Sequence, residues 1–253
     1  MTIANPLYDT IFKKLMENDR VAKFFIGTLL EQNIHALQVI TQEFPNPKDV
    51  HKSSSGTIGS KEQQSQEVSS KNFFQLDFIA TILTDTGEPE KVHVEIQKIK
   101  NFIEPRMLSS FQALHYNRKG TFDYEKRKLP SITIYILGFN LPEIQSACIK
   151  LENTYEDLIS NKMINHKIDF IEKLSQDCYI VQVNRITERF ETSLDKLLSI
   201  FEQSNFLDGG KLMKDFNHEI DEENIKLMID ILHHASINPE QRKIMEIEQE
   251  QPG

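Results

Sequence analysis

Apolar positions near the start of the chain recur at helical spacing. Between residues 9 and 31 the apolar side chains fall three and four positions apart, as in a helix with one buried face. Asn18-Asp19 interrupts this stretch and favours two helices over one. A weaker alternation over residues 36–44 predicts a first strand, which Pro45 ends.

The strongest β pattern covers residues 73–83 and 91–97, which are rich in β-branched and aromatic side chains. The turn residues Asp85-Thr86-Gly87 lie between the two runs. Together these features predict a β-hairpin.

The remaining pattern alternates between strands and helices. Residues 102–119 fit a helix, and the apolar runs at residues 131–137 and 178–183 predict buried strands. From about Phe190 onward the pattern is helical, with an acidic stretch between two apolar helical segments. Residues 51–70 differ from all of these, because seven of the twenty are Ser and three are Gln. So little apolar surface predicts a mobile insertion.

Two acidic residues interrupt the apolar strands of the hairpin. Side chains alternate between the faces of a strand, so turning both apolar faces to the core places Asp77 beside Glu95 and Gln97. His93 shares this face and contacts either the acidic group or solvent. Neighbouring carboxylates repel each other and are costly to desolvate, which a shared cation such as Mg²⁺ would explain. The alternative is the solvated side of an antiparallel hairpin.

Composition narrows the class of protein. The chain has 253 residues, of which 39% are hydrophobic, enough for one large domain or a domain with a helical appendage. No run approaches the roughly 18 apolar residues that span a membrane, and the N-terminal residues lack a signal pattern. We therefore expect a cytoplasmic protein without membrane association. Cys148 and Cys178 fit core thiols. The sequence contains no glycine-rich phosphate-binding motif, so we expect no nucleotide cofactor.

Charge is segregated along the chain, whose net charge is −9. Residues 98–128 carry eight basic and three acidic side chains, a balance of +5, and residues 188–253 carry seven and fifteen, a balance of −8. The first segment is either a DNA-binding surface or a solvated loop. Its candidate DNA contacts are Arg106, Arg118, Lys119, Lys126, Arg127 and Lys128. The second segment could be an interaction module that forms homodimers.

The order of the segments resembles the PD-(D/E)XK nuclease superfamily. The resemblance rests on a first helix with Asp9, a strand carrying Leu76-Asp77, a strand reading Val-Glu-Ile-Gln at residues 94–97, and the helix and strand that follow. The recombination-promoting nuclease and transposase branch is most similar, since its tail also resembles residues 238–250.

The resemblance implies an α/β fold with a mixed β-sheet of restriction-endonuclease-like type, an αβββαβ core flanked by helices. Residues 1–187 would form the nuclease-like domain, with the insertion at 51–70. Residues 188–253 would form an acidic helical C-terminal extension.

The resemblance also implies roles for single residues. Asp77 and Glu95 would bind Mg²⁺ or Mn²⁺ together with the backbone carbonyl of Ile96. Gln97 would take the place of the catalytic Lys that ends this motif in other members. The first helix would contribute Asp9, and the positive charge at the phosphate would come from Lys13 or Arg106. Asp9 and Lys13, four residues apart, could instead be an ordinary surface ion pair.

These features predict a metal-dependent DNA endonuclease that hydrolyses phosphodiester bonds. Gln97 qualifies the prediction, because a neutral amide can orient a water molecule but supplies no positive charge. The alternative is a DNA-binding or accessory protein of the same fold with a degraded site.

Overall fold

A mixed α/β fold is seen in the computed structural model. It describes residues 1–40, 73–84, 86–102, 129–152, 155–164, 178–204 and 212–250. An eight-stranded sheet has the order β2-β3-β4-β5-β9-β6-β7-β8. Its strands are β2 (Ile34–Ile40), β3 (Phe73–Leu83), β4 (Pro89–Ile99), β5 (Ser131–Leu137), β6 (Cys148–Leu151), β7 (Tyr155–Asp157), β8 (Lys162–Ile164) and β9 (Cys178–Gln182). The pairs β4–β5 and β5–β9 are parallel and the other neighbours antiparallel, which confirms a mixed sheet.

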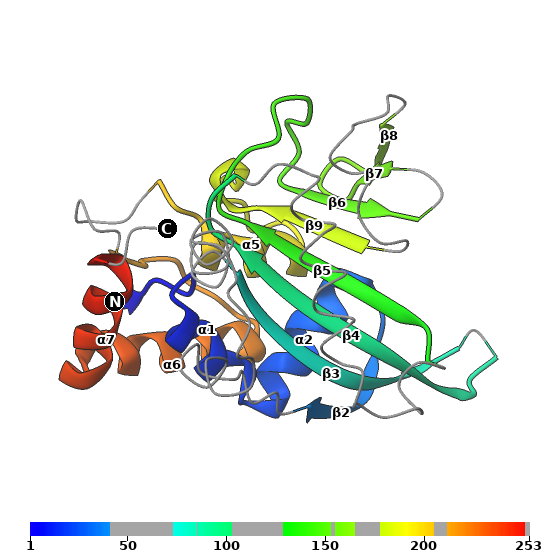
Figure 1. The fold of residues 1–253 in the computed structure, drawn as a ribbon, viewed down its shortest axis with the longest axis horizontal. Helices are drawn as coiled ribbons and strands as arrows, with labels where there is room; N and C mark the ends of the chain where they lie inside the picture. The colour runs from blue at the N-terminus through cyan, green and yellow to red at the C-terminus, as the bar shows by residue number, and fades with distance from the viewer. Residues whose placement is uncertain are drawn as a thin grey trace, which may run out of the picture.

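The predicted hairpin forms the longest part of this sheet (Figure 1). Strands β3 and β4 pair from Phe73 opposite Ile99 to Leu83 opposite Pro89. In the turn, Gly87 has a φ of 80°, a left-handed conformation that favours glycine, and its N–H donates to the carbonyl of Thr84 at 2.8 Å. The hairpin prediction is therefore confirmed, and the second strand is longer at both ends than predicted.

The described helices are α1 (Asp9–Met16), α2 (Asp19–Leu30), α5 (Ser193–Phe201), α6 (Glu223–Ile237) and α7 (Pro239–Glu250), with a 3₁₀ turn η5 (Val183–Arg185). In Figure 1, α2 and α5 lie behind the sheet, whereas α1, α6 and α7 lie toward its left end. The predicted break between the first two helices is confirmed, because the Asn18 side chain accepts a hydrogen bond from the Val21 N–H at 3.1 Å and caps α2. Among the described helices, none is long and apolar enough to cross a membrane.

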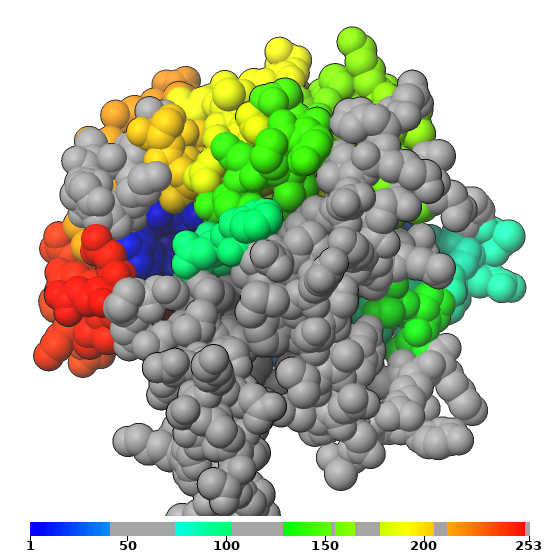
Figure 2. Space-filling model, turned by 45° about the horizontal axis from the view of Figure 1, so that its top comes forward, coloured from blue at the N-terminus to red at the C-terminus, as the bar shows by residue number. Residues whose placement is uncertain are grey.

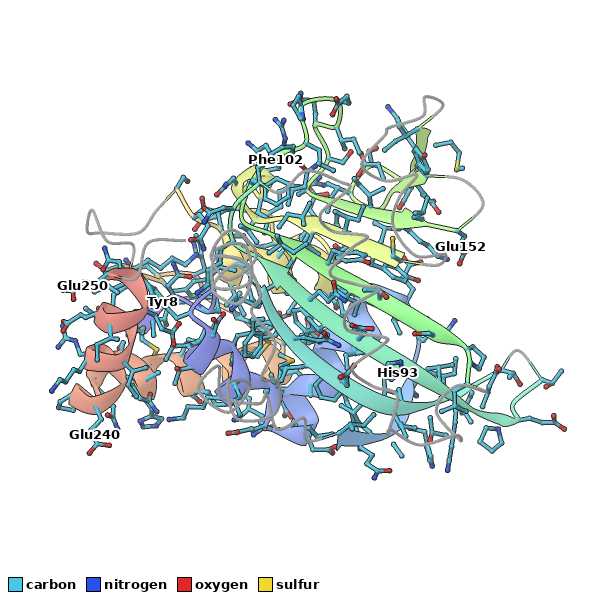
Figure 3. The ribbon with its side chains drawn as sticks, in the orientation of Figure 1. Tyr8, His93, Phe102, Glu152, Glu240 and Glu250 are labelled. Carbon is cyan, nitrogen blue, oxygen red and sulfur yellow. The ribbon has the colours of Figure 1, made fainter. Side chains whose placement is uncertain are left out.

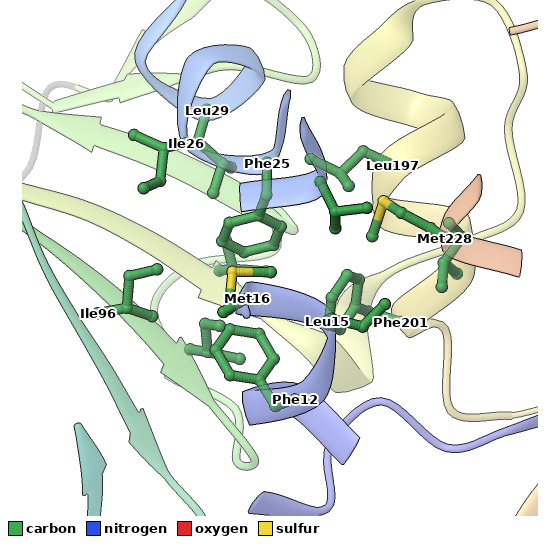
Figure 4. Close-up of a cluster of buried hydrophobic side chains, with 14 of the residues drawn as sticks. Phe12, Leu15, Met16, Phe25, Ile26, Leu29, Ile96, Leu197, Phe201 and Met228 are labelled. Carbon is green, nitrogen blue, oxygen red and sulfur yellow. The ribbon is translucent and has the colours of Figure 1, made fainter. Parts of the chain in front are cut away.

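The main core lies between the sheet and these helices (Figure 4). On the sheet side it contains the even-numbered hairpin positions, among them Phe78, Val94 and Ile96, which are fully buried. On the helix side, the ring of Phe12 lies 5.7 Å from that of Phe25, edge to face. The strand alternation read from the sequence therefore selects the face that meets the helices.

A second, smaller cluster lies on the opposite face of the sheet. It contains the odd-numbered β5 positions Tyr135 and Leu137 together with Ile99 of β4 and Ile180 of β9, all almost fully buried. The sheet is thus apolar on both faces toward β9, whereas on the hairpin the same face carries the polar side chains of Gln75, Asp77, Glu95 and Gln97.

The C-terminal third joins the main core. Leu197, Phe201 and Met228 are buried in the same cluster as Phe12, and the rings of Phe12 and Phe201 lie 6.3 Å apart. The part of the chain predicted as an extension therefore shares one hydrophobic core with the N-terminal helices.

A short two-stranded sheet ties the N-terminus to this region. Strand β1 (Thr2–Ala4) pairs antiparallel with β10 (Met213–Asp215). The expectation of helices alone after Phe190 is therefore wrong, because strands of three residues are too short to produce a periodic pattern. The C-terminal helix α7, red in Figure 2, also lies beside the blue N-terminal segment.

Two predicted strands have bounds that differ from the structure, and two other predicted segments fall outside the described residues. The first predicted strand begins at Ile34 instead of residue 36 and is described as far as Ile40. The strand predicted over residues 178–183 ends at Gln182, where η5 begins. The predicted helix at 102–119 and the insertion at 51–70 lie outside the described residues, apart from Phe102.

Candidate metal centre

The register of the hairpin brings the predicted acidic residues together. Asp77 is directly opposite Glu95, and the flanking pairs on the same face are Gln75 with Gln97 and Ile79 with His93. Asp77 is 1% exposed and Glu95 is 4% exposed. This burial contradicts the alternative of a solvated hairpin face.

Hydrogen bonds from neighbouring side chains hold both carboxylates. The Gln75 amide nitrogen lies 3.2 and 3.3 Å from the two Asp77 oxygens. The Gln97 amide nitrogen donates to Glu95 Oε1 at 2.6 Å. Each glutamine is two positions from its acid on the same strand, so the amides stand beside the carboxylates and fix their orientation.

His93 joins this group. Its Nε2 lies 3.1 Å from Asp77 Oδ1, and its Nδ1 lies 3.2 Å from the Ser131 hydroxyl oxygen. The sequence left two environments open for His93, and the structure places it against the acidic group. In Figure 3 it lies on the strands, far from the C-terminal helix that carries Glu240 and Glu250.

Asp77, His93 and Glu95 present a donor set that suits a divalent cation. One ligand atom from each residue lies within 4.8 Å of the others. Two carboxylate oxygens and an imidazole nitrogen are common metal ligands, and a cation between them would relieve the repulsion of the two buried acids. The residues therefore fit a metal ion by both charge and spacing.

Asp9 belongs to a different group. Its carboxylate oxygens pair with Lys98 Nζ at 2.8 Å and Lys100 Nζ at 3.2 Å, whereas Lys13 is exposed. Lys98 follows Gln97 on β4, so its side chain points to the other face of the sheet. There its Nζ lies 5.1 Å from the ring centre of Phe12. The structure therefore does not bring Asp9 or Lys13 to Asp77 and Glu95.

Burial and ion pairing act in opposite directions on the pKa values of Asp9 and Lys98. Burial raises the pKa of Asp9, but attraction to Lys98 and Lys100 and hydrogen bonds from both outweigh it, so the pKa lies below its usual value. Burial lowers the pKa of Lys98, and attraction to Asp9 opposes this shift only in part. The pair is a structural contact in the helix-facing core.

Of the other predicted site residues, Ile96 lies in the described part of the chain, whereas the proposed DNA contacts do not. The side chain of Ile96 lies in the main core, and its backbone runs between β3 and β5, where Ile96 pairs with Leu76 and Ile134. A role for its carbonyl stays a prediction. The proposed DNA contacts lie outside the described residues: Arg106, Arg118, Lys119, Lys126, Arg127 and Lys128.

Sequence reasoning missed two partners of the site. Gln75 could have been found, because extending the alternation by two positions from Asp77 reaches it. Ser131 could not, because it meets His93 only through the parallel pairing of β4 with β5. Nothing in the sequence near residue 131 specifies that neighbour.

Comparison with protein-family models, with curated proteins and with solved structures found no match to this chain. The geometry by itself defines the site as a buried carboxylate and imidazole cluster on a mixed sheet.

Proposed function

We propose that this protein is a metal-dependent DNA endonuclease that hydrolyses phosphodiester bonds at Asp77 and Glu95. The observation that carries the proposal is the pairing of these two acids, directly opposite each other and buried, with amide groups that hold both carboxylates. Two opposed carboxylates repel each other, and a bound cation would relieve that repulsion.

The residues have separable roles in this proposal. Asp77 and Glu95 would hold the cation, which lowers the pKa of a bound water molecule and neutralises charge on the scissile phosphate. Gln97 keeps the Glu95 carboxylate in place through its 2.6 Å hydrogen bond. Its amide can also orient a water molecule by hydrogen bonding, but it adds no positive charge.

DNA is proposed as the substrate for two reasons taken from the sequence. The order of the acidic motifs resembles the PD-(D/E)XK superfamily, and residues 118–128 carry five basic and two acidic side chains. Restriction-endonuclease-like topology belongs to the same proposal and is supported by the mixed sheet, in which the acidic hairpin β3–β4 lies next to the edge strand β2.

The test is cleavage of supercoiled plasmid DNA with Mg²⁺ or Mn²⁺ and with EDTA. We expect nicking by the wild type with metal, and a loss of at least about 100-fold in Asp77→Asn and Glu95→Gln, because metal ligands contribute several kcal/mol to such reactions. Glu90→Gln, an exposed residue of the same strand, is the matched control and should retain activity. Equal activity in all variants would contradict the proposed site.

The position of Asp9 favours a second candidate. Because Asp9 is held on the other face by Lys98 and Lys100, the acidic residue expected from the first helix does not reach the centre. The protein would then bind DNA or assist a partner without cutting. Fluorescence anisotropy with labelled DNA separates the two, since this candidate predicts binding by the wild type that Asp77→Asn leaves unchanged, together with no cleavage.

A further inference from the structure

We propose that His93 is a third protein ligand of the metal centre and that the site selects a first-row transition ion such as Mn²⁺ over Mg²⁺. This inference rests on the proposed metal-dependent function and specifies its cofactor. Its starting point is that His93 Nε2 and Asp77 Oδ1 face each other at 3.1 Å.

This separation fits two ligands of one ion. Donors that are each about 2.1 Å from a metal and at right angles to each other lie about 3.0 Å apart. The distance between His93 Nε2 and Asp77 Oδ1 is close to that value. Glu95 completes a triangle of donor atoms that lie within 4.8 Å of one another. Donors on opposite sides of one ion lie about 4.2 Å apart, so a small movement of the side chains brings all three to the same ion.

The imidazole ring is held from its other side. Nδ1 lies 3.2 Å from the Ser131 hydroxyl, and the His93 backbone N–H donates to the Pro130 carbonyl at 2.8 Å. With an ion bound, a proton on Nδ1 donated to Ser131 would leave the lone pair of Nε2 for the metal; without the ion, Nε2 donates its proton to Asp77 and Nδ1 accepts from Ser131. Metal-binding histidines commonly have their second nitrogen fixed in this way.

The carboxylates are oriented just as firmly. Gln75 contacts both oxygens of Asp77, and Gln97 binds one oxygen of Glu95, so each acid is fixed before any ion arrives. His93 is 13% exposed and Asp77 1% exposed, so the donors are largely shielded from solvent. Such a site discriminates between ions by the chemistry of its donors.

The nitrogen donor determines the class of ion. Mg²⁺ takes oxygen ligands and retains several waters, whereas Mn²⁺, Fe²⁺, Co²⁺ and Zn²⁺ accept imidazole readily. With Asp77 and Glu95 alone, the site would suit Mg²⁺. The addition of His93 shifts the preference toward the transition ions.

Calorimetric titration with MnCl₂ and with MgCl₂ tests this inference. We expect His93→Ala to weaken Mn²⁺ binding by at least about tenfold and to change Mg²⁺ binding much less. His35→Ala removes an exposed histidine of β2 and is the matched control, with both affinities unchanged. Ser131→Ala should weaken Mn²⁺ binding by a smaller factor, because it removes only the partner of Nδ1.

Pulsed electron paramagnetic resonance gives a readout independent of affinity. Mn²⁺ bound to ¹⁵N-labelled wild type should show coupling to one imidazole nitrogen, and this coupling should be absent in His93→Ala. Thermal melting of both proteins checks that the variant is folded. A folded variant that lacks the nitrogen coupling supports the inference.

The possible failures are distinguishable. If Mn²⁺ affinity is the same in the wild type and His93→Ala and no nitrogen coupling is seen, the role of His93 is overturned. The proposed metal centre then survives if Asp77→Asn abolishes metal binding and cleavage. If the wild type binds neither ion, both this inference and the proposed function are wrong.

Discussion

The two faces of the hairpin bury charge in different ways. On the helix-facing side, the carboxylate of Asp9 meets the ammonium groups of Lys98 and Lys100. On the other side, Asp77 and Glu95 stand opposite each other, held by glutamine amides. The first arrangement pairs unlike charges, whereas the second places like charges together. Strand alternation puts the two arrangements on adjacent residues of β4, so the same strand supplies a structural contact and a candidate binding site.

Variants on the two faces should change the free energy of unfolding in different directions. The largest change is expected on the helix-facing side, for Asp9→Asn. Asp9→Asn leaves Lys98, which is 3% exposed, as a buried cation without its carboxylate. We expect the free energy of unfolding to fall by about 2–4 kcal/mol, because an uncompensated buried charge is costly. Urea titration measures it. The double variant Asp9→Asn with Lys98→Met should recover most of the loss, and an unchanged single variant would contradict the pairing.

Stabilisation by bound metal should depend on Asp77 and not on Asp9. With Mn²⁺ at 100 times its dissociation constant, the wild type should gain about 2.7 kcal/mol of stability, as expected for any ligand that binds only the folded state. Asp77→Asn should gain much less, and Asp9→Asn should gain as much as the wild type. Urea titrations with and without MnCl₂ compare the three. Loss of the gain in Asp9→Asn would couple the two faces and contradict their separation.

Lowering the pH should weaken the ion pair of Asp9 with Lys98 and Lys100. Because the pKa of Asp9 lies below its usual 3.8 in the folded protein, its contribution is fully present above that value and is lost as the pH falls through the folded pKa. The stability difference between wild type and Asp9→Asn should therefore be constant near neutral pH and shrink below about pH 4. Burial opposes the ion pairing, so we expect a modest slope. A constant difference down to pH 2.5 would contradict the assignment.

The smallest effect is expected for the acidic pair without metal. In EDTA, Asp77→Asn or Glu95→Gln removes the repulsion between opposed carboxylates, and we expect unchanged or slightly higher stability, by up to about 1 kcal/mol. Thermal melting at pH 7 measures the change. A strong loss of stability in both variants would instead give the pair a structural role.

Much of the site could be predicted from local patterns. The hairpin over residues 73–97 follows from β-branched and aromatic runs around a glycine turn, and its alternation places Asp77 beside Glu95. The break at Asn18 follows from capping chemistry. These features depend on neighbours in the chain, so the sequence contains the information that specifies them.

Other features depend on contacts between distant segments. The pattern placed Asp9 and Lys13 on one helix face, but Asp9, at the start of α1, is paired with Lys98 and Lys100 at the end of β4. The C-terminal third looked like an appendage, yet Phe201 packs on Phe12 in the main core. Neither contact leaves a periodic signal in the sequence.

The sequence by itself determined which side chains share a strand face, because alternation and turn geometry are local. It therefore supplied Asp77, Glu95 and Gln97. Only the tertiary structure decided that this face is buried, that β5 brings Ser131 to His93, and that Asp9 lies on the other side. Sheet order and helix packing set these outcomes, and both arise from the burial of apolar surface across the whole chain.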